Sequence, residues 1–170
     1  MQIGRRGGQG RGVAIAGLIA SGVWILFVGL VVLFGVMGSA QRDAAGKVIR
    51  SGSVSIGSVH VGDCVDGLAN GEVATSVTAV PCTQPHDAEV IANVALPAGD
   101  WPGVDATHQE ARSICEQQVA QKLANSPMLD RLRILDLFPH NKAAWDRGNP
   151  ITCLVVDLQN GGRLTGPVGS

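Results

Sequence analysis

The segment Val13–Met37, VAIAGLIASGVWILFVGLVVLFGVM, contains twenty-five consecutive residues without a charged side chain. As an α-helix rising about 1.5 Å per residue it would reach roughly 37 Å, more than the hydrocarbon core of a bilayer at about 30 Å. Backbone amides find no water in lipid, and a helix pairs them all within one segment. The sequence therefore predicts one N-terminal transmembrane helix that enters the lipid bilayer through residues 13–37.

The charges on the two sides of this segment indicate its orientation. Residues 1–12 carry Arg5, Arg6 and Arg11 but no acid, whereas all fourteen Asp and Glu residues lie after the span. Positive residues stay on the cytoplasmic side, although three basic residues within 42–50 weaken this signal. We expect a signal-anchored, single-pass protein of the cell membrane, with a cytoplasmic tail at residues 1–12 and an extracytoplasmic C-terminal domain.

A cleaved signal peptide is the alternative to an anchor. Gly38-Ser39-Ala40 has the spacing of small residues found at signal-peptidase sites, which would place the cleavage after Ala40. The apolar core of a signal peptide is about 7–15 residues long. The apolar run is longer here, so we favour the uncleaved anchor.

Four cysteines beyond the span point to an oxidising compartment. Their spacings of 18, 33 and 38 residues include no Cys-x-x-Cys motif and suit disulfides better than a zinc site. Cys64 and Cys82 each lie near the end of a predicted strand, which favours a local Cys64–Cys82 bridge. Cys115 falls on the apolar face of a predicted helix and Cys153 within a strand, so a second bridge would staple the helix to the sheet.

The periodicity of apolar residues beyond the span changes from strand-like to helical and back. Thr107-His108-Gln109-Glu110 has the form of a capping box before an amphipathic helix. Ser126-Pro127 predicts a second short helix, residues 132–138 fit either a strand or a helix end, and residues 139–148 fit a loop or a single helical turn. Alternating or continuous apolar runs predict strands at residues 54–61, 73–80, 86–96 and 151–158.

These elements define the expected domain organisation. Residues 38–53, rich in Gly, Ser and charge, predict a flexible stalk, residues 54–160 the folded domain, and residues 161–170 a flexible end. The predicted fold class is α+β: a small disulfide-stapled extracytoplasmic domain preceded by one transmembrane helix.

The densest polar cluster lies in Pro81–Val90, PCTQPHDAEV. Cys, His, Asp and Glu side chains bind metals or exchange protons. If a strand follows His86, however, Asp87 and Glu89 share one face and His86 points away. We therefore favour a structural turn and assign no catalytic residue, no metal site and no cofactor. His86, Asp87 and Glu89 stay as candidate binding residues.

Aromatic residues are scarce, and only three lie beyond the span. Trp101 and Trp145 could form a platform for a sugar or peptide, but the favoured interpretation places both in the core. The near-neutral net charge gives no reason to expect a nucleic-acid partner.

Taken together, several motifs resemble the septum formation domain of actinobacterial membrane and secreted proteins. The resemblance covers about residues 59–158 and is strongest in the Pro-Cys-x-x-Pro-His-Asp-Ala-Glu core. It implies a cell-envelope protein, often single-pass, linked to septation or envelope growth and without known enzymatic activity. The motifs are Gly62-Asp63-Cys64, Val80–Val90, Trp101-Pro102-Gly103, Cys115, and the run from Pro139 through Trp145 and Gly148 to Cys153.

Three functions are compatible with these features. The favoured one is a membrane-tethered, non-enzymatic domain that binds an envelope or division-complex protein. The second is a metal-dependent or acid/base envelope enzyme centred on His86, Asp87 and Glu89. The third is an accessory subunit of a membrane protein complex.

Overall fold

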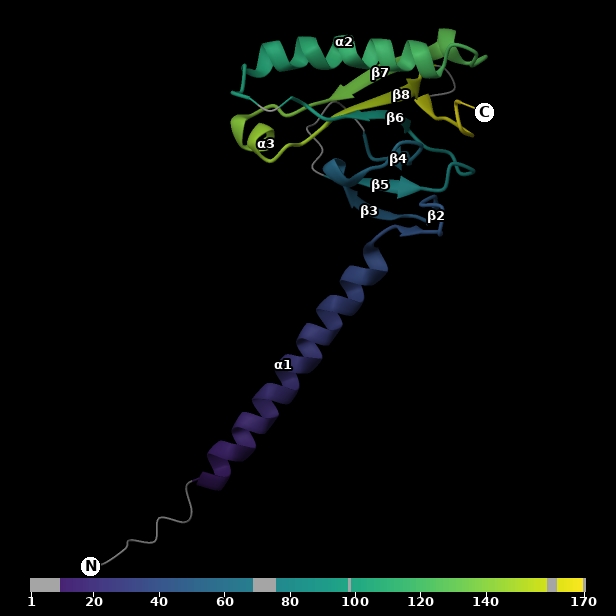
Figure 1. Cartoon of the computed structure of the whole chain (residues 1–170). Helices are drawn as coiled ribbons and strands as arrows, with labels where there is room; N and C mark the ends of the chain where they lie inside the picture. The colour runs from purple at the N-terminus through teal and green to yellow at the C-terminus, as the bar shows by residue number, and fades with distance from the viewer. Residues whose placement is uncertain (1–9, 69–75, 98, 159–161, 170) are drawn as a thin grey trace, which may run out of the picture. The chain divides into compact units, whose positions relative to one another are not determined.

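A computed structural model of the chain describes residues 10–68, 76–97, 99–158 and 162–169, in two compact units, residues 1–39 and 40–170 (Figure 1). The first unit is the single helix α1, Gly10–Gly38. It contains Ile15–Gly35, which is long and apolar enough to cross a membrane. Most of the predicted tail at residues 1–12 lies outside the described residues.

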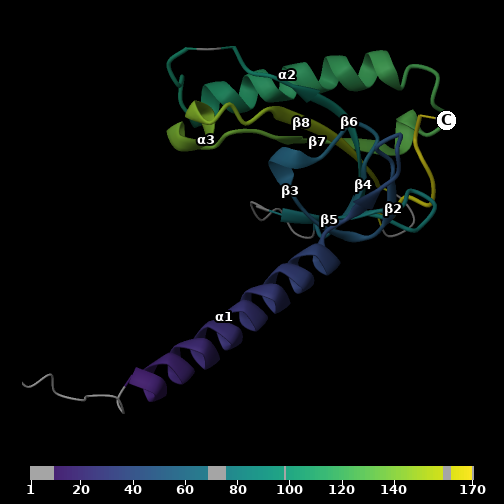
Figure 2. The ribbon, with the colours of Figure 1, turned by 60° about the horizontal axis from the view of Figure 1, so that its bottom comes forward.

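The second unit is built on a six-stranded antiparallel sheet with the order β3-β5-β4-β6-β8-β7. The sheet curves strongly, so that β3 and β5 lie opposite β7 and β8 rather than in one plane (Figures 1 and 2). The strands are β3 (Gly52–Ser55), β4 (Cys64–Asp66), β5 (Ser76–Val80), β6 (Ala88–Val94), β7 (Leu132–Leu137) and β8 (Ile151–Asp157).

The strand β8 is the centre of the domain, because all seven of its residues are buried. Its side chains alternate between the two faces of the sheet. Leu154 and Val156 pack with β4, β5 and β6 inside the curve of the sheet. Ile151, Cys153 and Val155 belong to clusters on the face that the helix α2 (Val104–Lys122) covers. Burial on both faces explains why this segment is the most continuous apolar run of the domain.

Both predicted disulfides are confirmed. Cys64 and Cys82 are joined at the end of the β4–β5 ladder, and Cys115 on α2 is joined to Cys153 on β8. The second bridge staples the helix to the sheet, as the sequence predicts. The α+β fold class is likewise confirmed, with α2 lying along β6, β8 and β7 (Figure 1).

The start of α2 differs from the predicted capping box. The helix begins at Val104, with Gly103 as its N-cap at φ 99°, a backbone conformation that favours glycine. Thr107 lies inside the first turn, where its hydroxyl donates to the Gly103 carbonyl oxygen at 2.8 Å. The turn formed by Gly103 therefore starts the helix one turn before the predicted Thr107 cap.

Other boundaries also differ from the predictions. The short 3₁₀ helices η1 (Ile56–Ser58) and η3 (Leu129–Arg131) replace the end of the first predicted strand and the helix predicted at Ser126-Pro127. Residues 132–137 form the strand β7, one of the two alternatives for 132–138. Within residues 139–148, for which a loop or a single helical turn is predicted, the helical turn α3 (Lys142–Asp146) is present. The first part of the strand predicted at 73–80 lies outside the described residues.

The predicted stalk is wrong for most of its length. Residues 41–50 form the two-stranded antiparallel sheet of β1 (Gln41–Arg42) and β2 (Val48–Arg50), and Val48 is buried. Arg42 donates two hydrogen bonds to the buried carboxylate of Asp63, at 2.6 and 2.7 Å. This ion pair fastens the segment to the domain although its composition is typical of a linker.

The predicted flexible end is also wrong for residues 162–169. Leu164 and Val168 are fully buried in the cluster between the sheet and α2. Leu164 exchanges backbone hydrogen bonds with His86 at 2.8 and 3.0 Å, and Ser126 donates its hydroxyl to the Val168 carbonyl oxygen. We call residues 162–169 the closing segment, because it completes this part of the core.

Candidate functional site

The structure brings His86 and Glu89 together but separates Asp87 from them. His86 lies before β6, and the chain bends at Asp87, so the strand alternation that would turn His86 away from Glu89 begins only at Ala88. The expectation that His86 points away is therefore wrong. Asp87 accepts hydrogen bonds from the Gly67 amide and from Arg163, on a different side of the strand end.

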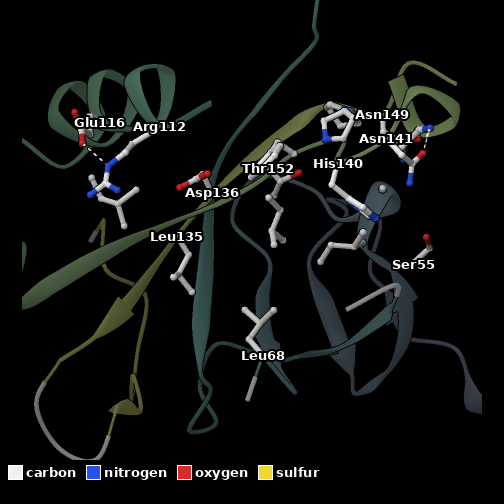
Figure 3. Close-up of a pocket in the computed structure, with 18 of the residues that line it drawn as sticks. Ser55, Leu68, Arg112, Glu116, Leu135, Asp136, His140, Asn141, Asn149 and Thr152 are labelled. Carbon is white, nitrogen blue, oxygen red and sulfur yellow. Dashed lines mark hydrogen bonds and ion pairs between the residues drawn. The ribbon is translucent and has the colours of Figure 1, made fainter. Parts of the chain in front are cut away.

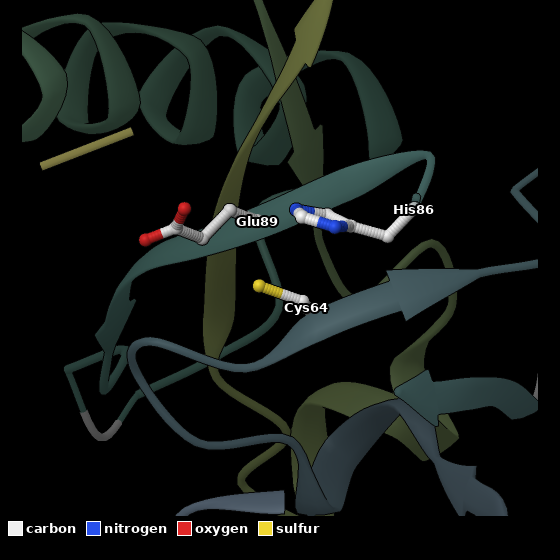
Figure 4. Close-up of side chains that lie close together, drawn as sticks. All are labelled: Cys64, His86 and Glu89. Atoms are coloured by element: carbon white, nitrogen blue, oxygen red, sulfur yellow. The ribbon is translucent and has the colours of Figure 1, made fainter. Parts of the chain in front are cut away.

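The resulting cluster consists of Cys64, His86 and Glu89 (Figure 4). Cys64 and Glu89 lie directly opposite each other across β4 and β6, so their side chains share a face. One sulfur, nitrogen or oxygen atom from each of the three residues lies within 4.8 Å of those from the other two. All three residues are buried, with 0, 0 and 7% of their surfaces exposed.

The two titratable members of the cluster are held by backbone groups. His86 Nδ1 lies 2.8 Å from the Gln84 carbonyl oxygen, while Nε2 is buried without a hydrogen-bond partner among the described residues. Glu89 Oε2 accepts the Val168 amide at 2.7 Å, which places the carboxylate directly under the closing segment. Burial raises the pKa of the Glu89 carboxyl, and the Val168 hydrogen bond and the charge of His86 oppose this rise.

A small cleft gives solvent access to one side of this cluster. It measures about 550 Å³ and is lined by the β1–β2 hairpin, by Cys82 and Glu89, and by Pro167 and Gly169 of the closing segment. His86 and Cys64 do not line it. A molecule in the cleft would therefore meet Cys82 and the Glu89 carboxylate, with the imidazole behind them.

The sequence analysis missed two arginines that pair with acidic residues next to this cluster in the sequence. Arg42 is one, and its hydrogen bond to Asp63 raises the pKa of the guanidinium above its ordinary value, which keeps it charged. Arg163 is another, since it pairs with Asp66 and Asp87 and donates to the Pro85 carbonyl oxygen. Each contact joins residues at least 21 positions apart, so no local pattern marks them. Leu164 is likewise fully buried although its segment contains few apolar residues, so no local pattern marks it either.

A second hollow, larger than this cleft, lies along the outer edge of β7 (Figure 3). This groove measures about 1480 Å³, and every residue of β7 lines it. Ser55, Ile56 and Gly57, at the end of β3 and in η1, form the opposite wall, and Leu68 and Leu135 project into the space between (Figure 3). The groove thus lies between the two outer strands of the curved sheet, and both apolar and polar side chains line it.

Charges on the rim of the groove are mostly basic. Arg112 pairs with Glu116 at 3.3 Å, and Asp136 faces His108 at 3.4 Å. Arg133 and Arg147 line the groove, are exposed, and have no acidic partner within the part of the chain that the structure describes. Two unpaired guanidinium groups therefore remain available to an acidic ligand.

The candidate binding residues Trp101 and Trp145 do not line the groove. Both are half-buried, and their rings make no contact with each other among the described residues. Trp145 Nε1 donates to the Gly99 carbonyl oxygen at 2.8 Å, which ties α3 to the loop before α2. The structure favours a supporting role for Trp145 over an aromatic platform.

An apolar N-terminal helix followed by an α+β domain with two disulfides defines the class: a candidate single-pass membrane protein with a disulfide-bonded domain. Residues 33–153 match the family model described as Septum formation, so the chain belongs to the septum formation family. This finding confirms the resemblance in the sequence and points to a role in septation or the cell envelope. No curated protein and no solved structure matches the chain.

Proposed function

We propose that the protein is a membrane-tethered, non-enzymatic binding protein of the cell envelope that acts in septation or envelope growth. In this proposal α1 crosses the membrane, residues 1–12 are cytoplasmic, and residues 40–170 lie on the extracytoplasmic side. The observation that carries the proposal is the combination of a long apolar helix with a disulfide-bonded domain of the septum formation family. Disulfides persist in oxidising compartments, which supports the proposed side of the membrane.

The groove along β7 is the proposed binding site. An edge strand presents unpaired N–H and C=O groups on its outer side, and an extended peptide can pair with them as an additional strand. Apolar side chains such as Leu68 and Leu135 offer contacts for alternate residues of that peptide. Because Arg133 and Arg147 stand unpaired on the rim among the described residues, the proposed ligand is an extended, acidic segment of another envelope protein.

Membrane attachment and orientation are tested by fractionation and protease protection. The full-length protein is expected to stay in the membrane pellet after a carbonate wash, and its domain should be digested in spheroplasts without lysis. A mature N-terminus at Gln41 would show that the segment is a cleaved signal peptide. Protection of the domain until lysis would place it in the cytoplasm and remove the envelope role.

Binding is tested with a photocrosslinking amino acid placed in dividing cells at Arg133, on the groove, or at the exposed Gln109 on α2. We expect a specific crosslinked partner from position 133 only. The double charge reversal of Arg133 and Arg147 to Glu should abolish copurification of that partner, whereas Lys47→Glu, an exposed lysine outside the groove, should not. Equal capture from both positions would contradict the groove as the site. Stoichiometric copurification of several membrane proteins would instead indicate an accessory subunit.

A further inference from the structure

A fourth metal-binding side chain, Cys82, lies next to the three of the cluster beneath the closing segment. Figure 4 shows the donor atoms of Cys64, His86 and Glu89 close together. Cys82 Sγ is bonded to Cys64 Sγ and so adjoins this group, although it is not one of the atoms that lie within 4.8 Å of one another. Two thiolates, an imidazole and a carboxylate are all ligands that zinc accepts in a tetrahedral site. While the disulfide is intact, the two sulfurs are bonded to each other, and only its reduction would release both as thiolates.

The imidazole of His86 is oriented as zinc-binding histidines are. With its proton on Nδ1 the ring donates to the Gln84 carbonyl oxygen at 2.8 Å, and the lone pair of Nε2 then points into the cluster. Metal-bound histidines commonly donate their second ring nitrogen to a backbone carbonyl in this way. Nε2 is fully buried and lacks any hydrogen-bond partner among the described residues, which is unusual for a polar atom in a folded core.

We propose that Cys64–Cys82 is a reducible disulfide and that its reduced form binds one zinc ion through Cys64, Cys82, His86 and Glu89. The proposal is independent of the groove and of its ligand. It assigns a ligand-binding role to the two residues of the Pro-Cys-x-x-Pro-His-Asp-Ala-Glu core that the structure brings together.

The reductant is a dithiol. One of its thiolates attacks Cys82 Sγ, which lines the small cleft, and the bond to Cys64 breaks with Cys64 leaving as a thiolate. The second thiolate of the reductant then attacks the mixed disulfide, so that the reductant becomes a cyclic disulfide and Cys82 is released. The two protons of the dithiol pass to Cys64 and Cys82. Zinc displaces both protons when it binds.

After reduction the Cys82 thiol has to turn towards the other three donor atoms, which themselves need only local movement. Tetrahedral zinc with ligand distances of about 2.0–2.3 Å places its donor atoms about 3.3–3.8 Å apart. The atoms of Cys64, His86 and Glu89 are already within 4.8 Å of one another. Glu89 can bind through Oε1, because Oε2 accepts the Val168 amide, and this hydrogen bond would orient the carboxylate as an outer-shell contact.

The second disulfide provides a matched comparison within the same chain. Cys115 and Cys153 are fully buried among apolar residues such as Ala111 and Ile151. The described residues place no metal-binding group of three or more His, Cys, Asp or Glu side chains around this bridge. It is therefore expected to resist the dithiol longer and to bind no zinc after reduction.

The first experiment measures which disulfide is reduced. The full-length protein in detergent is titrated anaerobically with dithiothreitol, alkylated and analysed by peptide mass spectrometry. We expect Cys64 and Cys82 to be alkylated at reductant concentrations that leave Cys115–Cys153 intact. Earlier or simultaneous reduction of Cys115–Cys153 would overturn the first half of the proposal.

The second experiment measures metal binding after the reductant is removed. One zinc ion per reduced chain and none per oxidised chain are expected, and Co²⁺ should give the thiolate charge-transfer and visible bands of a tetrahedral site. His86→Ala and Glu89→Gln should each weaken binding by about tenfold or more. His60→Ala, an exposed histidine on the same cleft, and the double variant Cys115→Ser/Cys153→Ser should bind as the wild type does.

The outcomes are decisive even where a variant is unstable. Near-UV circular dichroism of each oxidised variant reports folding, and Glu89→Gln keeps an acceptor for the Val168 amide, so at least one ligand variant should fold. Wild-type protein that binds no zinc after selective reduction refutes the site. If the His86 and Glu89 variants bind zinc as well as the wild type does, only the two cysteine thiolates can be ligands, and the proposed ligand set is overturned.

Discussion

The ion pair between Arg42 and Asp63 gives the most direct test of how residues 40–53 join the domain. The guanidinium makes two hydrogen bonds of 2.6 and 2.7 Å to a carboxylate whose side chain is only 4% exposed. Arg42→Ala leaves that carboxylate buried without its counter-charge. If residues 40–53 were an independent stalk, the same substitution would not affect the stability of the domain.

The magnitude follows from the burial of the two partners. Removing one partner of a buried ion pair costs about 3–5 kcal/mol. Arg42 keeps 20% exposure, so water can enter the vacated space, and Asp63 still accepts the His60 amide at 2.7 Å. We therefore expect a loss of about 2–3 kcal/mol in the free energy of unfolding. For a domain of this size that corresponds to a decrease in Tm of about 6–15 °C.

The assay is thermal and urea unfolding of the oxidised, full-length protein in detergent, followed by near-UV circular dichroism. Arg50→Ala is the matched control, because Arg50 lies in the same small sheet but is exposed, and its side chain has no hydrogen bond or ion pair among the described residues. Adding Asp63→Asn to Arg42→Ala should recover part of the lost stability by removing the stranded charge. Equal midpoints for Arg42→Ala and Arg50→Ala would refute the reasoning.

Three further predictions concern the core. Because burial raises the pKa of Glu89 in the folded state, the ionised carboxylate opposes folding near neutral pH. The stability of the wild type relative to Glu89→Gln should therefore rise as the pH falls through the folded pKa towards the unfolded pKa. A difference in urea midpoints that does not change with pH would contradict this prediction. Leu164→Ala should lower the free energy of unfolding by about 2–5 kcal/mol, because Leu164 is fully buried. The control Thr165→Ala, at an exposed position, should change it very little in the same urea titration. Similar losses for the two variants would show that the closing segment is not part of the core. Replacing Cys115 and Cys153 by Ser should lower the free energy of unfolding by about 4 kcal/mol through release of the 38-residue loop, and an unchanged midpoint would mean that the bridge does not constrain the unfolded chain.

The elements that the sequence predicts well are those in which local pattern and final burial agree. The apolar run of β8 and the helical spacing around Cys115 mark buried surfaces directly. Cysteines near strand ends predict the first bridge, and Cys115 on the apolar face of the helix predicts the second, to Cys153 in the strand. Gly103 was missed as the start of α2 because its positive φ follows from the turn and not from any periodic pattern.

The failures have one physical cause, which is contact between residues far apart in the chain. Residues 40–53 and 162–169 have the Gly-rich, polar composition of linkers, yet Arg42 meets Asp63 and Leu164 meets His86. The cluster of His86 and Glu89 was missed for the same reason. The backbone pairing of His86 with Leu164 turns its ring towards Glu89 before the strand begins, and the local sequence contains no sign of that partner.

The position of the closing segment sets the order in which the molecule can mature. Ribosomes make this segment after every other element of the domain, and chains fold as they emerge. Both cysteines of the first bridge, together with His86 and Glu89, are therefore synthesised well before Leu164 and Val168 can cover them. In a chain that folds as it emerges, these side chains therefore stay uncovered until residues 162–169 dock.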